Sequence, residues 1–170
     1  DRVPGHREGH GHGGEGEVHR LSLLELEVDA PRLAGRGRDQ KDITVYLPNN
    51  HALRVLSVGM DANAELKPPP VFALKSPLVC YGSSVLQGTG AHHPSRTYPA
   101  GLARRLNLDF VNLGFGGAGK AEPAVVDLVN QLDACGFIFD LGKSYGNQTI
   151  EPYVRMLASI RSAHPRVPIL

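Results

Sequence analysis

The spacing of hydrophobic residues changes near residue 70 and divides the chain into two parts. Before that point, apolar and polar side chains alternate in three short runs, at 24–28, 43–47 and 53–58. A two-residue period is typical of a half-buried antiparallel strand, because successive side chains point to opposite faces of a sheet. We therefore expect residues 18–70 to form a small β-strand module, a partial β-sandwich, that ends in the three prolines at 68–70.

From residue 71 onward the pattern alternates between apolar runs and helical periods. Apolar runs that are typical of strands lie at 78–82, 108–111, 135–141 and 167–170. Hydrophobic residues recur at helical spacing over 98–106, 122–132 and 150–160. Strands that alternate with helices build a parallel sheet with right-handed crossovers. The predicted fold class is thus α/β, a flavodoxin-like doubly wound parallel sheet over 71–170 that follows the antiparallel β module.

Residues 1–17 differ from both parts, because they are rich in glycine and lack apolar periodicity. Three histidines, His6, His10 and His12, fall in this segment. Imidazoles on a flexible chain can converge on a transition metal. However, no cysteine or carboxylate cluster completes such a site, and ordering a flexible chain costs conformational entropy. We interpret the segment as a flexible loop or tail.

The charges of the chain nearly cancel, since 18 Lys and Arg side chains face 17 Asp and Glu side chains. No basic field therefore favours nucleic acid or an anionic membrane surface as a partner. No apolar stretch approaches the roughly 20 residues that span a bilayer, and no signal peptide is visible. The two cysteines, Cys80 and Cys135, fall in predicted buried strands; free thiols are the main interpretation, and a disulfide between neighbouring strands stays open. The compartment, cytoplasmic, periplasmic or extracellular, stays open as well.

Small and polar residues follow three of the predicted strands directly. The first strand leads into residues 82–84 (Gly-Ser-Ser), the second into 112–117 (Asn-Leu-Gly-Phe-Gly-Gly) and the third into 140–147, which ends in asparagine. In a doubly wound sheet these loops share the carboxyl edge, where such folds bind ligands. A serine on a tight turn, a glycine loop that exposes backbone N–H groups and a polar loop with an amide together indicate acyl transfer.

These loops resemble the sequence blocks of the SGNH hydrolases, also called GDSL-type esterases. Residues 82–85 (Gly-Ser-Ser-Val) look like the first block, G-D-S-L, with serine in place of aspartate, which makes Ser84 the matching nucleophile. Residues 112–117 match the second block, N-x-G-x-x-G, and the resemblance implies that the backbone N–H of Gly117 joins the oxyanion hole. The segments 46–48 and 57–59, followed by Tyr-Gly-Ser-Ser, resemble the bacterial branch that carries an N-terminal β-sandwich module.

The third block departs from the family pattern. Its asparagine, whose amide donates to the oxyanion, aligns with Ser144, which follows Lys143. The nearby asparagine is Asn147, three residues later. Either Asn147 reaches the site through a remodelled loop, or Ser144 serves instead, or one donor is missing. The loss of one oxyanion donor typically costs about 10²–10³ in turnover.

The general base is the larger departure. The family takes it from a D-x-x-H block near its C-terminus, and no D-x-x-H occurs in these 170 residues, so we expect the chain to stop before that block. A serine hydroxyl needs an adjacent base to act as a nucleophile. His164 is predicted at the amino-terminal edge of the sheet, away from Ser84. His92 and His93 lie in a loop that could border the pocket.

Other polar residues near the strand ends are weaker candidates. Asp140 ends an apolar strand and could act as a hydrogen-bond acceptor in the site. Arg96 and Lys143 could contact substrate, although a solvated surface position is the default for both. The resemblance implies short acyl esters as substrates, including acetylated carbohydrates, and a mechanism that needs no metal or organic cofactor.

Two alternative functions are also compatible with this sequence. A chain without the D-x-x-H block could be a catalytically degenerate domain that binds carbohydrate, or a subunit of an assembly as a homo-oligomer or with a partner chain. The glycine run 114–119 also fits the dinucleotide fingerprint G-x-G-x-x-G, with Asp140 about 20 residues further on as the ribose ligand. We favour the hydrolase, because this run follows the second strand of the domain and the third hydrolase block explains Asp140 equally well.

Overall fold

The computed structural model describes residues 42–52, 54–55, 62–146 and 148–170. They all belong to one compact unit, Arg38–Leu170. The glycine-rich segment with its three histidines and the strand predicted at 24–28 lie outside the described residues. Most of the strand predicted at 53–58 lies outside them as well.

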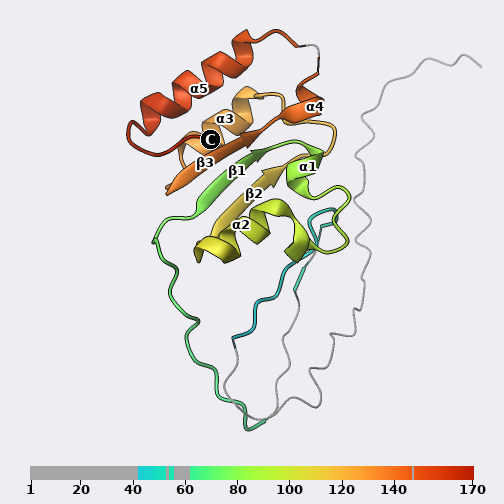
Figure 1. Ribbon diagram of the computed structural model, residues 1–170, viewed down its shortest axis with the longest axis vertical. Helices are drawn as coiled ribbons and strands as arrows, with labels where there is room; N and C mark the ends of the chain where they lie inside the picture. Colours follow the sequence, from blue (N-terminus) through green and yellow to red (C-terminus); the bar gives the residue numbers. More distant parts are fainter. Residues whose placement is uncertain (1–41, 53, 56–61, 147) are drawn as a thin grey trace, which may run out of the picture. The chain divides into compact units, whose positions relative to one another are not determined.

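The described part of the chain is built on a parallel sheet of three strands in the order β2-β1-β3 (Figure 1). These strands are β1 (Leu78–Gly82), β2 (Phe110–Gly114) and β3 (Gly136–Asp140). Beside β3, Ile169 forms a parallel bridge with Phe137, and the N–H of Phe139 donates to the Leu170 carbonyl at 3.0 Å. The fourth predicted strand thus starts next to β3, which gives the strand order 2-1-3-4 of flavodoxin-like sheets.

Helices lie on both faces of this sheet (Figure 1). α3 (Pro123–Asn130) and α5 (Glu151–Ala163) cover one face and pack with Val79 and Tyr81 of β1. α2 (Tyr98–Leu106) covers the other face, where Leu78 and Cys80 are buried. The remaining helical turns are short: α1 (Ser84–Gln87), η1 (Pro94–Arg96) and α4 (Gly142–Tyr145). The predicted doubly wound α/β fold is therefore confirmed.

The boundaries of α2 follow from its sequence. Thr97 precedes the helix, and its Oγ1 accepts a hydrogen bond from the N–H at the third helical position at 3.4 Å, while Pro99 occupies the first turn. At the other end, the N–H of Leu108 still donates to the Ala103 carbonyl at 2.9 Å. The apolar pattern predicted that β2 begins at residue 108. It begins at Phe110 instead, because the backbone of Leu108 still closes the helix.

The strand predicted over 43–47 is wrong, because 42–48 has no regular secondary structure. Its alternating apolar residues Ile43, Val45 and Leu47 are all exposed. A strand needs a neighbour that completes its backbone hydrogen bonds, and no segment in the described ranges pairs with 43–47. The β module over 18–70 stays a prediction, since most of it lies outside those ranges.

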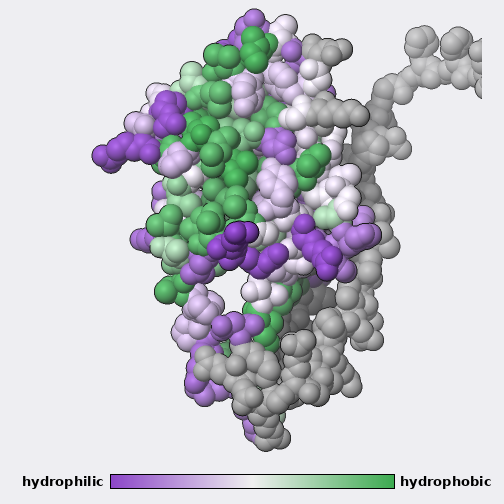
Figure 2. Space-filling model, viewed as in Figure 1, coloured by the Kyte–Doolittle hydropathy of each residue, from purple (hydrophilic) through white to green (hydrophobic). Residues whose placement is uncertain are grey.

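The surface mixes hydrophobic and hydrophilic residues (Figure 2). Ile150 and Val154, near the start of α5, and Leu170, beside β3, are more than half exposed. Within the described ranges, no helix combines the length and the apolar character that crossing a membrane requires.

Candidate active site

The three strand ends that the sequence singled out lie level with one another. Gly82 at the end of β1 pairs in register with Gly114 of β2 and with Asp140 of β3. The N–H of Ser83 donates to the Asp140 carbonyl at 2.9 Å. On the other side, the N–H of Phe115 donates to the Gly82 carbonyl at 3.0 Å. The backbones of both neighbouring loops therefore hold the serine turn (residues 82–84).

Glycine is required where these backbones approach each other most closely. A Cβ atom on Gly82 would lie 2.0 Å from the Asp140 carbonyl oxygen. Gly119 has a φ of +79°, and a Cβ there would lie 2.5 Å from the Gly82 carbonyl oxygen and 2.9 Å from the nitrogen of Ser83. Side chains at these positions would push the serine turn away from β3 and from the glycine loop (residues 115–121).

The two serines of the turn differ in exposure. Ser83 is only 2 % exposed, and its carbonyl accepts a hydrogen bond from the N–H of Gln87 at 3.0 Å. Ser84 begins α1 and is half-buried. Its carbonyl accepts hydrogen bonds from the N–H groups of Gly88 and Thr89, at 3.0 and 2.8 Å. The turn thus buries one serine and leaves Ser84 accessible at the carboxyl edge of the sheet.

The glycine loop begins with a tight turn. The N–H of Ala118 donates to the Phe115 carbonyl at 3.0 Å, and Gly117 between them has a φ of +75°, as in the third position of a type II turn. Gly117 is exposed, and no atom would lie within 4 Å of a Cβ placed on it. The space in front of Gly117 is therefore open.

This loop does not have the geometry of a dinucleotide-binding turn. In the G-x-G-x-x-G fingerprint the glycines lead directly into a helix whose N-terminus receives the pyrophosphate. Here Gly119 packs against the serine turn, and α3 begins only at Pro123.

Three amide side chains form hydrogen bonds at the end of α1. The Nδ2 of Asn112 donates to the Leu86 carbonyl at 2.9 Å, and its Oδ1 accepts from the N–H of Gly114 at 2.9 Å. The Nε2 of Gln87 donates to the Asn49 carbonyl at 3.1 Å, and the amide of Asn49 donates back to the Gln87 carbonyl. The asparagine of the second sequence block therefore links α1 to β2.

A hydrogen-bond network around Glu122, which the sequence analysis missed, supports the glycine loop. The Tyr81 hydroxyl donates to the Glu122 carboxylate. The same carboxylate accepts from the N–H of Gly119 at 3.2 Å and from that of Lys120 at 2.8 Å. Partial burial alone would raise the pKa of Glu122, but these hydrogen bonds lower it below its ordinary value. Burial, followed by the hydrogen bond and charge of Glu122, raises the pKa of Tyr81.

Asp140 has a partner that sequence reasoning also missed. The Tyr98 hydroxyl donates to Asp140 Oδ2 at 2.9 Å. Burial, followed by the hydrogen bond and charge of Asp140, raises the pKa of Tyr98. The structure thus places the Asp140 carboxylate next to the serine turn, with a hydroxyl donor already bound to it.

The third loop begins with α4 directly after β3. Ser144 falls within α4, whereas Asn147 lies outside the described residues. Whether Ser144 or Asn147 supplies the third oxyanion donor therefore stays a prediction, as does a contact between Lys143 and substrate.

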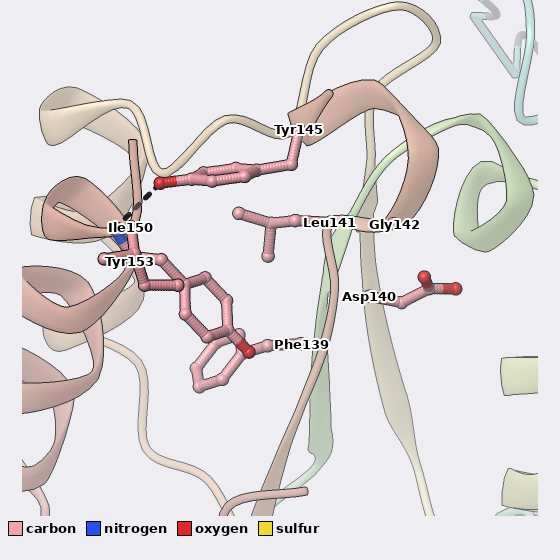
Figure 3. A pocket seen from close by; sticks show the side chains of 7 residues that line it. All are labelled: Phe139, Asp140, Leu141, Gly142, Tyr145, Ile150 and Tyr153. Carbon is pink, nitrogen blue, oxygen red and sulfur yellow. Dashed lines mark hydrogen bonds between the residues drawn. The ribbon is translucent and has the colours of Figure 1, made fainter. Parts of the chain in front are cut away.

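A hollow of about 260 Å³ lies beside the end of β3 (Figure 3). Aromatic and aliphatic side chains provide most of its lining: Phe139, Leu141, Tyr145, Ile150 and Tyr153. The Tyr145 hydroxyl accepts from the N–H of Tyr153 at 3.1 Å and donates to the Thr149 carbonyl at 2.7 Å. Asp140 borders the hollow too, but its carboxylate points away from both tyrosines (Figure 3).

The histidines take the places that the sequence predicted. The His164 ring packs against Phe137 at a tilt of 54°, with ring centroids 4.9 Å apart, and its Nε2 lies 3.2 Å from the Asn130 carbonyl oxygen. Phe137 lies near the start of β3, so His164 sits toward the end of the sheet opposite Ser84. His92 and His93 are exposed in the loop before η1. Arg96, at the end of η1, is exposed as well.

The described residues contain neither a disulfide nor a cluster of metal ligands. Cys80 and Cys135 are free thiols, which rules out a disulfide between them. No three His, Cys, Asp or Glu side chains within the described ranges gather into a group that could hold a metal ion. His6, His10 and His12 lie outside these ranges.

Comparison with known proteins gives a family match and several similar solved structures, of which two are described here. The model of the GDSL-like lipase/acylhydrolase family matches residues 75–170, which is more than half of the chain. A Bacteroides ovatus protein described as a GDSL-like lipase is 37% identical over 56% of this chain and 28% of its own, with a TM-score of 0.48. The salicylyl-acyltransferase SsfX3 from a tetracycline biosynthetic pathway is 31% identical over 57% of this chain and 32% of its own, with a TM-score of 0.50. The chain thus spans less than a third of these proteins. A search of curated proteins found no match.

Proposed function

We propose, on the premise that this chain belongs to the GDSL-like lipase/acylhydrolase family, that it carries the nucleophile of a serine esterase and that this nucleophile is Ser84. One observation carries the proposal. At the point where three strand ends meet, Ser83 is buried and Ser84 is accessible. Of the two adjacent serines, the more exposed one is also the one that matches the serine of the family's first block.

The proposed reaction is acyl transfer through a covalent intermediate. The Oγ of Ser84 attacks the ester carbonyl carbon, the alcohol leaves with a proton, and the acyl group stays on Ser84 until water releases it as the acid. A base must take the proton of Ser84 first. The family pattern assigns this step to the histidine of a D-x-x-H block, which does not occur in these 170 residues.

The proposed oxyanion hole uses backbone and side-chain donors from all three loops. The family resemblance assigns the N–H groups of Ser84 and Gly117 to this hole, and the open space in front of Gly117 supports its role. Either Asn147 or Ser144 supplies the third donor. Preorganised donors of this kind stabilise the negative charge that develops in the transition state.

For the substrate we propose short acyl esters, including acetylated carbohydrates. No cofactor takes part in this mechanism, because serine, base and oxyanion donors are sufficient for ester cleavage. The nearly balanced charge of the chain supports a small neutral substrate over a polyanion.

The test is labelling with a fluorophosphonate probe together with hydrolysis of 4-nitrophenyl acetate. Ser84→Ala should abolish both, whereas Ser95→Ala, in η1, should change neither. Ser83→Ala separates the two adjacent serines. If labelling survives in Ser84→Ala and disappears in Ser83→Ala, the nucleophile is Ser83 and the proposal is wrong.

A second candidate is a catalytically degenerate domain used for binding or assembly. The serine at the asparagine position of the third block favours it. It predicts a wild-type protein that neither reacts with the probe nor hydrolyses the ester, but that still retains acetylated carbohydrate on an affinity column.

A further inference from the structure

The side chain of Asp140 sits where two parts of the proposed active site meet. Its carbonyl accepts the hydrogen bond from Ser83, and its carboxylate lies over the start of the third loop. A Cβ atom on Gly142 would lie 3.0 Å from Asp140 Oδ1 and 3.7 Å from Ser83 Oγ. Asp140 thus joins the end of β3 to the serine turn through its backbone, while its carboxylate lies near the start of α4.

One described side chain fixes the direction of this carboxylate. The Tyr98 hydroxyl donates to Asp140 Oδ2 at 2.9 Å across 42 residues of sequence. Tyr98 is the first residue of α2, and Thr97 caps this helix directly before it. Because Pro99 and the Thr97 cap define the first turn of α2, the backbone that carries Tyr98 is rigid.

The hydroxyl remains a donor over the whole neutral range. Burial and the neighbouring carboxylate raise the pKa of Tyr98 above its ordinary value of about 10. The Tyr98 hydroxyl thus donates to Asp140 Oδ2 at neutral pH, while Asp140 Oδ1 lies near Gly142. The carboxylate faces away from the hollow between the two other tyrosines (Figure 3).

We propose that Tyr98 is a positioning residue for the serine site, because its hydroxyl holds the Asp140 carboxylate and thereby fixes the end of β3, whose Asp140 carbonyl accepts the hydrogen bond from Ser83. This inference rests on the proposed function of Ser84. Tyr98 needs no contact with substrate for this role. It acts through Asp140 on the position of the serine turn and so on the alignment of Ser84 with its substrate.

The expected effect of removing the hydroxyl falls on turnover and not on substrate binding. A displacement of about 1 Å at reacting groups can cost about a hundredfold in rate. We expect Tyr98→Phe to lower kcat by about tenfold to a hundredfold and to leave KM within about twofold, because the alignment matters in the transition state. Asp140→Asn should give a loss of the same kind, since an amide holds the tyrosine less firmly than a carboxylate does.

The experiment measures kcat and KM for 4-nitrophenyl acetate in the two single variants and in the double variant. Residues that act as one unit are not additive, so the double variant should be no more than about twofold slower than the slower single variant. Tyr46→Phe is the matched control. It removes a hydroxyl that accepts a hydrogen bond from Arg104 at 3.1 Å, and kcat should not change. Urea unfolding of each variant confirms that the fold is retained.

The outcomes separate this inference from the function on which it rests. A wild-type protein whose activity disappears in Ser84→Ala, but whose kcat survives in Tyr98→Phe, overturns the positioning role alone. A rise in KM without a fall in kcat also overturns it, because Tyr98 would then contact substrate. A wild-type protein without Ser84-dependent activity overturns the proposed function, and the positioning role with it.

Discussion

The hydroxyl of Tyr81 and the carboxylate of Glu122 form the hydrogen bond that joins the central strand to the glycine loop. Tyr81 is fully buried in β1, and Glu122 directly precedes α3. Because Glu122 also accepts from the N–H groups of Gly119 and Lys120, one carboxylate satisfies donors from the strand and from the loop. The loop that carries Gly117 is therefore tied to the core of the domain.

Loss of this hydroxyl should destabilise the fold. In Tyr81→Phe the ring keeps its edge contacts with Phe115 and Phe139, whose centroids lie 6.3 and 6.4 Å away. A hydrogen bond to a charged group contributes roughly 1.5–3 kcal/mol, so we expect a loss of that size in the free energy of unfolding, measured with urea. Tyr46→Phe should stay within about 0.5 kcal/mol of wild type. Equal stability of the two variants would show that the Tyr81 hydrogen bond contributes nothing.

The same carboxylate should make stability depend on acid pH. The pKa of Glu122 is lower in the folded protein than the ordinary value of about 4.3. The unfolded chain therefore binds the proton first, so the contribution of Glu122 is complete above about pH 4.3 and is lost as the pH falls through the folded-state pKa. In Glu122→Gln the urea midpoint should fall less steeply between pH 5 and 3 than in wild type. Parallel curves for the two proteins would contradict this assignment.

The two cysteines should react at different rates. Burial, followed by the charge of Cys135, raises the pKa of Cys80 to about 12, and Cys80 is fully buried. Cys135 is only half-buried, although burial raises its pKa too. The thiolate is the reactive form. At pH 8 a thiol reagent should therefore label Cys135 slowly in the folded protein and Cys80 only on unfolding. In Cys135→Ser the slow native phase should disappear; its persistence would mean that Cys80 is reached in the folded state.

Glycine substitutions can measure how tightly the loops pack. Gly117 and Gly119 have nearly the same φ, +75° and +79°, but only Gly119 has atoms close to its Cβ direction. Gly117→Ala should cost the roughly 1–2 kcal/mol of a left-handed residue. Gly119→Ala should cost clearly more, because the methyl group would meet the Gly82 carbonyl. Gly101→Ala in α2 should instead stabilise by about 0.5–1 kcal/mol. If the first two variants unfold at the same urea concentration, the contact with Gly82 is not tight.

The sequence predicted the elements whose signals are local. Thr97 and Pro99 mark the start of α2, and the apolar run that ends at Gly82 marks β1, because capping and burial depend on near neighbours. The strand over 43–47 was wrong, since alternation describes one strand and contains no information about a partner. The placement of Asp140 at the site was predicted from its position at a strand end, and the structure puts it beside the serine turn.

The pairs that support the site could not be predicted in the same way. Tyr81 and Glu122 are 41 residues apart, and Tyr98 and Asp140 are 42 apart. These contacts depend on the strand order, on where α2 begins and on where the glycine loop ends. One signal was available for Tyr81, because a tyrosine in a buried strand must find a partner for its hydroxyl. No local pattern could identify that partner as Glu122.

The level register of Gly82, Gly114 and Asp140 separates the placement of the proposed nucleophile from the choice of substrate. Peptide groups, which every sequence contains, set the position of Ser84 on its turn. Exposed side chains of the surrounding loops that take no part in these contacts can then be exchanged for others. A protein engineer could therefore diversify exposed loop residues such as His92 and His93 as a library, while the serine turn keeps its place.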